Sequence, residues 1–376
     1  MGLIKTVKSR GSISIDGIGL QNVSEPFELL RHDKDLWDLF TRKEEYGAPI
    51  HDCYDRFPFY MSENNCAFDP RVSKFFIENN VNFEYPDNKK FAVCLTHDID
   101  FINATKLNLI SDTAKFIHHR ELGTALRRPF IKVNKKWNPY INFETTMDLE
   151  EVYGAKSSFY FLSLDKGDQD FNYNLEYLSN EMGSIIDRGF EVGLQGSHRA
   201  LYSLEVLKHE KKRLENILGQ EVIGYRNHYL RFRVPETWEL LKQAGFKYDT
   251  TFGYPNCVGF RNGMCHPFKP FNRNTNLYIE ILEIPLIIMD GTLFNHMKLD
   301  LLGSWEVMKR IIDVVASCNG VVTILFHNFY LRGEYLELYE KTLKYCQDKN
   351  AFFASAECIY RWWEKDGYEQ YREGTR

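Results

Sequence analysis

The feature that most constrains the fold of this chain is a repeated alternation of short apolar runs with amphipathic segments, which begins near residue 91. Each apolar run has the length of a strand, and several are almost wholly apolar, as is typical of parallel strands that are covered on both faces. The runs lie at residues 91–95, 158–162, 190–194, 222–225, 281–286, 321–326 and 351–354. Strands that alternate with helices predict a mostly parallel sheet joined by right-handed crossovers.

The segments between these runs carry signals for the ends of helices. Leucines recur at helical spacing over residues 204–218, and Gly219 follows as a typical C-terminal cap. A second helix is predicted from Pro235 to about Gly245, and a third over residues 305–318. About seven parallel strands with such crossovers predict an α/β fold of the distorted (β/α) barrel type rather than a small open sheet.

The pattern also divides the chain. Residues 1–90 hold short polar and aromatic pieces without the alternation, and we expect them to form an N-terminal extension packed on the barrel of residues 91–376. The stretch from about 102 to 145 is longer than one crossover needs. It predicts helical hairpins over the mouth or the side of the barrel.

The composition excludes several classes of protein. With 376 residues, of which 44% are hydrophobic, the chain can bury a large core. Its formal charge of -5 offers no basic surface for a nucleic-acid backbone, so no nucleic-acid partner is expected. We see no signal peptide, no apolar run of membrane-spanning length and no C-x-x-C pair among the eight cysteines. These features predict a cytoplasmic protein, and no pattern indicates an oligomeric state.

Polar side chains follow four of the apolar runs. They are Asp98 and Asp100, then Gln195 and His198, then Arg226, His228 and Tyr229, and finally His327 and Asn328. In a parallel barrel the carboxyl ends of the strands meet at one rim, so we expect these side chains to lie together. Carboxylates, imidazoles and a guanidinium at one rim can bind a metal ion and transfer protons.

Each of these residues also has a structural interpretation. Asp98 and Asp100 can be turn residues, although two carboxylates behind a buried strand are costly without partners. His327 can be a histidine satisfied within the core, and Arg226 can form a structural ion pair.

Other polar residues are candidates for contact with a substrate. His228 and Asn328 are equally compatible with substrate contact and with support of neighbouring residues. Tyr229 follows His228, and His266 lies in a predicted loop that could reach the rim. His97 points to the opposite face of its strand from Asp98, which favours a packing role.

Taken in order, these segments resemble the motifs of the polysaccharide deacetylases, the NodB-like superfamily that includes carbohydrate esterase family 4. The first motif is matched by residues 95–100, the second by 189–198, the third by 224–229 and the last by 323–327. Residues 153–161 are similar to the second strand of the family and the segment that leads into it. Each motif is weak alone, but the ordered set is specific.

The resemblance implies a metal-assisted hydrolase that removes an N-acetyl group from an amino sugar in the synthesis of a surface polysaccharide or glycan precursor. It implies that Asp98 is the catalytic base, that Arg226 orients this base and that His327 is the acid. It also implies that Asp100 binds a divalent metal ion, for which we expect zinc.

The sequence departs from the family in the second motif. Gln195 stands where the family has its leading histidine ligand, Arg199 stands at the second ligand position, and His198 is displaced by one residue. An amide is a poor zinc ligand and a guanidinium cannot be one. We expect any ion to be held weakly by Asp100, with help from His198, His228 or water, and Gln195 is a further candidate ligand. Two alternatives stay open, namely hydrolysis of another acyl amide and a non-catalytic carbohydrate-binding relative that has lost its metal.

Overall fold

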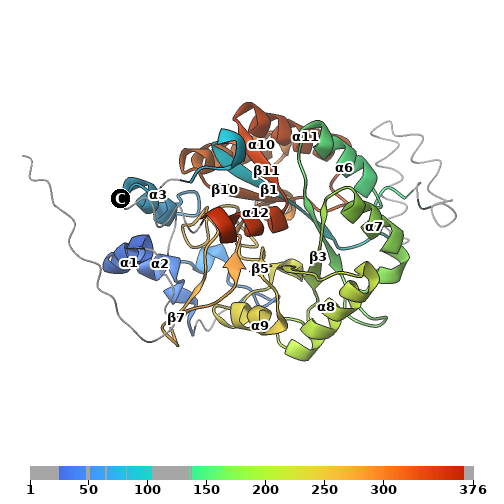
Figure 1. Ribbon diagram of the computed structural model, residues 1–376, viewed down its shortest axis with the longest axis horizontal. Coiled ribbons are helices and arrows are strands. Elements are labelled where there is room, and N and C mark those ends of the chain that lie inside the picture. The colour runs from blue at the N-terminus through green and yellow to red at the C-terminus, as the bar shows by residue number, and fades with distance from the viewer. Residues whose placement is uncertain are drawn as a thin grey trace, which may run out of the picture.

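The computed structural model describes residues 25–47, 51–63, 66–81, 83–103, 135 and 138–367. Within this part of the chain, nine strands form one curled parallel sheet surrounded by helices (Figure 1). In spatial order the strands are β8 (Leu282–Glu283), β5 (Tyr248–Asp249), β4 (Gly224–Asn227), β3 (Glu191–Gly196), β2 (Ser158–Leu162), β1 (Phe91–Ile99), β10 (Val321–Leu325) and β9 (Leu286–Met289), with β11 (Ala351–Ala354) also paired to β1. A separate antiparallel pair is formed by β6 (Phe271–Asn272) and β7 (Leu277–Tyr278).

This half-barrel of parallel strands confirms the predicted α/β barrel-like fold. The strand count differs from about seven for local reasons. The predicted strand at 281–286 is two strands, β8 and β9, because Pro285 between them has no backbone N–H to donate to a ladder. The two-residue strand β5 is too short to produce a periodic pattern in the sequence.

Strand β1 is the centre of the sheet. It pairs with β10 along one side, and along the other with β11 at its first half and β2 at its second half. All nine of its residues are buried, including His97 and Asp98. A fully buried strand carries polar residues only where partners satisfy them, so the end of β1 is the place to look for chemistry.

Ten α-helices are described in this part of the chain. They are α1 (Glu25–His32), α2 (Lys34–Phe40), α3 (Arg71–Glu78), α6 (Phe143–Val152), α7 (Ser179–Asp187), α8 (Leu204–Leu218), α9 (Glu236–Ala244), α10 (Leu301–Ser317), α11 (Gly333–Asp348) and α12 (Ala356–Trp362). The two glycines that were predicted to end helices do so. Gly219 and Gly245 adopt positive φ directly after α8 and α9. Helix α10 begins four residues earlier than predicted because the Asp300 side chain accepts a hydrogen bond from the Gly303 N–H as its N-cap.

Most of the stretch predicted to form helical hairpins, 102–145, lies outside the described residues. Of that stretch, the structure describes residues 102–103, 135 and 138–145, which include the first turn of α6. Within the described part of the chain, none of the helices combines the length and apolar character needed to cross a membrane.

Helices α1 to α3 lie together at one side of the sheet (Figure 1). Their apolar side chains, such as Phe40 and Phe76, belong to the same buried cluster as Phe268 of the barrel. A buried ion-pair network links the two parts as well, because the carboxylate of Glu45 binds the guanidinium groups of both Arg42 and Arg261. The division of the chain at residue 90 stays a prediction.

Helix α12 lies across the amino ends of β2 and β3. The backbone N–H of Ala356 donates to the Ser158 hydroxyl over 2.8 Å, and that of Glu357 donates to the Glu191 carboxylate over 2.8 Å. Ser158 and Glu191 are the first residues of these strands. One end of the sheet is thus covered by α12, and the opposite end carries the residues that follow the strands.

Candidate active site

The carboxyl ends of β1, β3, β4 and β10 bring the predicted polar residues into one cluster. Oxygen atoms of Asp98 and Asp100 and a ring nitrogen of His327 all lie within 4.8 Å of one another. Gln195 is in register with Arg226 on the neighbouring strand, and both face this group.

Asp98 is a buried carboxylate with spare hydrogen-bonding capacity. Its Oδ2 accepts one long bond of 3.3 Å from the amide of Gln195. Its Oδ1 lies 3.7 Å from a guanidinium nitrogen of Arg226 and has no hydrogen-bond partner among the described residues. Burial raises the pKa of Asp98, and the positive charges of Arg226 and His327 only partly offset this effect. A carboxylate with a raised pKa and a free oxygen is suited to accept a proton.

Arg226 is held rigidly beside this carboxylate. It is fully buried, and it donates to the hydroxyls of Thr250 and Thr96 over 2.9 and 3.0 Å. The Tyr160 ring lies 5.3 Å from its guanidinium carbon. Its remaining nitrogen, Nη1, faces Asp98. With three sides fixed, the guanidinium can orient the carboxylate but cannot move far from it.

His327 is oriented by an aspartate that the sequence analysis missed. Asp290, just after β9, accepts hydrogen bonds of 2.6 Å from both the backbone N–H and the ring Nδ1 of His327. The other ring nitrogen lies 3.5 Å from Asp100. Burial alone would lower the pKa of His327, but the carboxylates of Asp290 and Asp100 outweigh it and raise the pKa to about 10. Asp290 also follows an apolar run, so the strand-end criterion applied to 286–289 would have found it.

Gln195 donates hydrogen bonds in this cluster through its amide nitrogen, and its role as a metal ligand stays a prediction, because its Oε1 has no hydrogen-bond partner among the described residues. Its amide nitrogen lies 2.8 Å from Asp100, 3.3 Å from Asp98 and 3.1 Å from Nδ1 of His228. The two carboxylate acceptors around one nitrogen identify that atom as the NH₂ group, which has no lone pair for a metal. The amide therefore occupies a place between the carboxylates that would suit a cation. His327 and His228 hold the pKa of Asp100 well below its usual range, although burial works against them.

A second cluster adjoins the first. Asp170 lies in the loop between β2 and α7 and accepts from the ring of His198 over 2.8 Å. His228 lies between the two clusters, with one ring nitrogen 3.4 Å from Asp100 and the other 3.6 Å from Asp170. Ligating atoms of Asp170, His198 and His228 all lie within 4.8 Å of one another. The structure thus groups His198 with Asp170, which no sequence pattern singled out, rather than with Asp100.

The ionisation of this second cluster follows from its charges. Burial would lower the pKa of His228, but the neighbouring Asp100 and Asp170 carboxylates raise it to about 9. Burial lowers the pKa of His198, and the hydrogen bond to Asp170 compensates only in part. Hydrogen bonding to His228 is the leading cause that lowers the pKa of Asp170.

Two of the residues predicted to bind substrate do not face the cluster. His266 is fully buried, with its ring nitrogens 2.9 Å from the Ser73 hydroxyl and 3.2 Å from the Asn319 carbonyl. Asn319 precedes β10 whereas His327 follows it, so His266 lies at the opposite end of the sheet. The loop that carries it packs into the core instead of reaching the rim.

Asn328 is the second of these residues. Its amide is buried and donates to the backbone carbonyls of Phe101 and Tyr140 over 2.9 and 2.8 Å. It therefore ties together the loops that follow β1 and β10, and this geometry supports a structural role and not contact with substrate.

Tyr229 and the N-terminal extension meet at the mouth of the cluster. The Tyr229 ring stacks on Tyr54, with centroids 4.6 Å apart, and it also lies 5.2 Å from the ring of His198. Arg56 donates to the Tyr229 carbonyl over 2.9 Å, and Arg231 donates back to the Tyr54 carbonyl over 2.8 Å. These contacts place Tyr54 and Arg56 beside the candidate active site, which the sequence alone did not predict.

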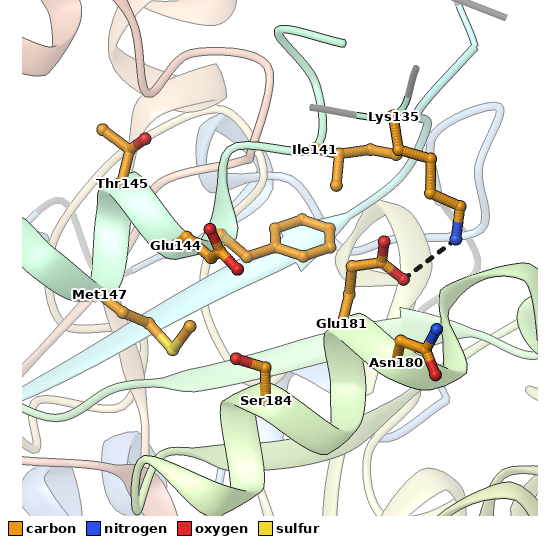
Figure 2. Close-up of a pocket in the computed structure, with 9 residues that line it drawn as sticks. Lys135, Ile141, Glu144, Thr145, Met147, Asn180, Glu181 and Ser184 are labelled. Carbon is orange, nitrogen blue, oxygen red and sulfur yellow. Dashed lines mark hydrogen bonds and ion pairs between the residues drawn. The ribbon is translucent and has the colours of Figure 1, made fainter. Parts of the chain in front are cut away.

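A pocket of about 240 Å³ lies elsewhere, between helices α6 and α7 (Figure 2). Its walls include Phe143 and Met147 of α6 and Glu181 of α7, and Lys135 forms an ion pair with Glu181 over 3.2 Å. None of the residues described at the strand ends lines it. We therefore locate the candidate active site at the rim of the sheet and not in this pocket.

Comparison with known proteins supports the fold. No protein-family model matches the sequence, and no curated protein matches it. Among solved structures, a protein from Mycobacterium smegmatis described as a polysaccharide deacetylase is similar with a TM-score of 0.52 and 16% identity, covering 75% of this chain and 92% of that chain.

More distant similarities involve the same group of proteins. Peptidoglycan deacetylase PdaC from Bacillus subtilis has a TM-score of 0.38 at 14% identity, covering 77% of this chain and 98% of its own. A mutant of BA3943, a CE4 family pseudoenzyme, has a TM-score of 0.39 at 9% identity, covering 75% and 71%. Because these two scores are low, the assignment rests on the first similarity and on the sheet itself. The first similarity and the sheet show that this chain has the fold of the Mycobacterium smegmatis polysaccharide deacetylase.

Proposed function

We propose that this protein hydrolyses the N-acyl bond of an acylated amino sugar, with Asp98 as base and His327 as acid. The observation that carries the proposal is the pairing of these two groups in one buried cluster, each with its own orienting partner. Asp98 faces Arg226 and His327 is held by Asp290. Two titratable groups with different environments are what a reaction with separate base and acid steps requires.

The first step needs a base. A water molecule attacks the acyl carbon, and its proton passes to Oδ1 of Asp98, the oxygen without a hydrogen-bond partner among the described residues. Arg226 favours the ionised form of Asp98 before the transfer and keeps the carboxylate aimed during it. The product of this step is a tetrahedral adduct with a negatively charged oxygen.

The second step needs an acid. The bond between the acyl carbon and the sugar nitrogen breaks, and the nitrogen takes a proton from Nε2 of His327. The pKa of about 10 keeps this ring protonated at neutral pH, and Nδ1 cannot serve as the donor because it is bound to Asp290. A carboxylic acid and a free amine leave the site.

A divalent metal ion, when bound, would polarise the acyl carbonyl and lower the pKa of the attacking water. The described residues offer two sets of donors for such an ion, Asp98–Asp100–His327 and Asp170–His198–His228. The first set contains the proposed base and acid, whose proton transfers require them to be free of the ion.

The substrate class rests on the fold and on the mouth of the site. The stacked rings of Tyr54 and Tyr229 supply an aromatic surface next to His228, and such a surface suits the apolar face of a sugar. We propose that Tyr229 and His228 contact an N-acetylated sugar or glycan precursor of polysaccharide synthesis.

The test is release of acid from acylated substrates by the purified protein. Acetate release from N-acetylated amino sugars and short acetylated oligosaccharides supports the proposal. Release of formate or another acid from non-sugar amides, without release of acetate from sugars, would show that the substrate is not a sugar. The proposed amide hydrolysis would then still stand. The D98N variant serves as the matched control for contaminating activity.

A second candidate is a non-catalytic carbohydrate-binding protein. The amide of Gln195, which stands between Asp98 and Asp100 where a cation would fit, favours it. Binding of acetylated sugars without release of any acid, at saturating zinc, would establish this alternative and refute the hydrolase.

A further inference from the structure

Three metal-ligating side chains outside the base-acid pair converge from consecutive strand-end loops. Asp170 follows β2, His198 follows β3, and His228 follows β4. Oδ2 of Asp170 lies 2.8 Å from Nε2 of His198 and 3.6 Å from Nε2 of His228. The three groups therefore direct a carboxylate oxygen and two imidazole nitrogens toward one point.

This donor set matches what zinc requires, and its spacing is close to that of a zinc site. Open zinc sites in hydrolases commonly use two imidazoles and one carboxylate, with a fourth position for water or substrate. Ligand atoms at about 2.0–2.2 Å from a tetrahedral ion lie about 3.3–3.6 Å apart, so the 3.6 Å separation fits this range and the 2.8 Å separation is shorter than it. The side chain of Asp170 is 34% exposed and that of His228 only 6%, so the open side of the group faces solvent near Asp170.

The first cluster supports the second. Gln195 has two amide hydrogens, and the carboxylates of Asp98 and Asp100 are stronger acceptors for them than the imidazole of His228. Nδ1 of His228 can then keep its own hydrogen and donate it to Asp100, 3.4 Å away. Metal-ligating histidines almost always have such a carboxylate or carbonyl behind them, which leaves the other ring nitrogen for the ion.

We propose that Asp170, His198 and His228 form the divalent-metal site of this protein, with zinc as the best-matched ion and Asp100 as the group that orients His228. The site is displaced from Gln195, whose amide fills the place between Asp98 and Asp100. Its catalytic meaning rests on the proposed function, but the binding of the ion does not.

The experiment measures metal binding and not turnover. Purified full-length protein is freed of metal with a chelator and titrated with Zn²⁺ by calorimetry, and with Co²⁺ by its visible absorption. We expect one ion per chain. D170N and H198Q are expected to weaken Zn²⁺ binding by at least about 100-fold, since removing only a supporting group behind a ligand already costs 10–100-fold.

Three further variants make the result specific. H327Q and D98N alter the other cluster and are expected to leave the zinc affinity within about 3-fold of the wild type. H209Q removes an exposed histidine that faces Asp165 over 3.4 Å, a His–Asp pair away from the site, and is expected to have no effect. Thermal unfolding of each variant checks that it folds.

The outcomes separate this site from the proposed reaction. Absence of Zn²⁺ and Co²⁺ binding by the wild type, or loss of binding in H327Q equal to that in D170N and H198Q, overturns the metal site. Because D170N and H198Q test the same site independently, the experiment stays decisive if one of these two variants fails to fold. If the ion binds as proposed but no acylated substrate releases acid, the hydrolase fails and the metal site stands.

Discussion

Buried polar groups differ in their hydrogen bonding between the two ends of the parallel sheet. At the amino end, Glu191 has both carboxylate oxygens bonded, to Ser158, to the Glu357 N–H and to the Tyr248 hydroxyl. At the carboxyl end, Asp98 keeps one oxygen without a hydrogen-bond partner among the described residues. Both carboxylates are buried, and burial is the leading cause that raises the pKa of each.

The histidines show the same difference. His266, near the amino end of β10, is neutral because burial lowers its pKa to about 4, and both ring nitrogens have uncharged partners. His327, just after the carboxyl end of β10, is charged because Asp290 and Asp100 overcome the effect of burial. The identity of a buried side chain therefore says little about its function by itself. What distinguishes the carboxyl end, which holds the candidate active site, is buried charge with incomplete partners.

The largest expected effect is at Asp98. We expect D98N to reduce acid release by about 10²–10⁴-fold, because an amide cannot accept the proton of the attacking water. The thermal unfolding midpoint is expected to stay close to that of the wild type, since Asn keeps the shape of the side chain. Retention of more than half of the wild-type rate would show that Asp98 is not the base.

A smaller effect on rate is expected from Asp290, the partner of His327. In D290N the charge that does most to raise the pKa of His327 is lost, so this pKa falls. The acid works only when protonated, so activity is lost as pH rises through its pKa, and this alkaline limb moves to lower pH in the variant. We expect a loss of about 10-fold or more near pH 9 and a smaller loss near pH 7. Measurement of kcat/KM against pH checks this, and an alkaline limb that does not move contradicts the acid role of His327.

At the amino end, we expect His266 to affect stability and not activity. H266A removes a buried ring that packs 4.6 Å from Phe83 and leaves Ser73 and Asn319 without its hydrogen bonds. The free energy of unfolding is expected to fall by about 2–4 kcal/mol. Urea unfolding measures this loss, and the KM of the folded variant serves as the second readout. A raised KM with unchanged stability would restore His266 as a substrate-binding residue.

The smallest expected effect is the pH dependence caused by Glu191. Its pKa in the folded protein is about 7, above the ordinary value of 4.5. The folded state thus binds this proton more tightly than the unfolded chain does, and its contribution to stability is lost as pH rises from about 4.5 through 7. E191Q cannot titrate, so its stability relative to the wild type is expected to rise by about 2–3 kcal/mol between pH 5 and 8. Urea unfolding at the two pH values tests the sign, and a difference that does not change with pH would mean that Glu191 ionises normally.

Much of the fold was predictable because local signals agreed with it. The apolar run at 91–95 and the glycines that end α8 and α9 needed no long-range information. Pro285 shows the limit, since the apolar stretch around it was predicted as one strand and forms parts of two. A proline in such a run is itself a signal that could have been used.

For the candidate site, the sequence by itself determined which side chains stand at the ends of strands. Parallel strands carry whatever follows them to one rim, so Asp98, Arg226 and His327 had to approach one another once the sheet formed. Only the tertiary structure decided how loop residues pair, because a loop has no period that fixes its direction. It turned His198 toward Asp170 and packed His266 into the core. It also directed the amide hydrogens of Gln195 at the two carboxylates, a choice that depends on how the carboxyl ends of β1 and β3 lie relative to each other.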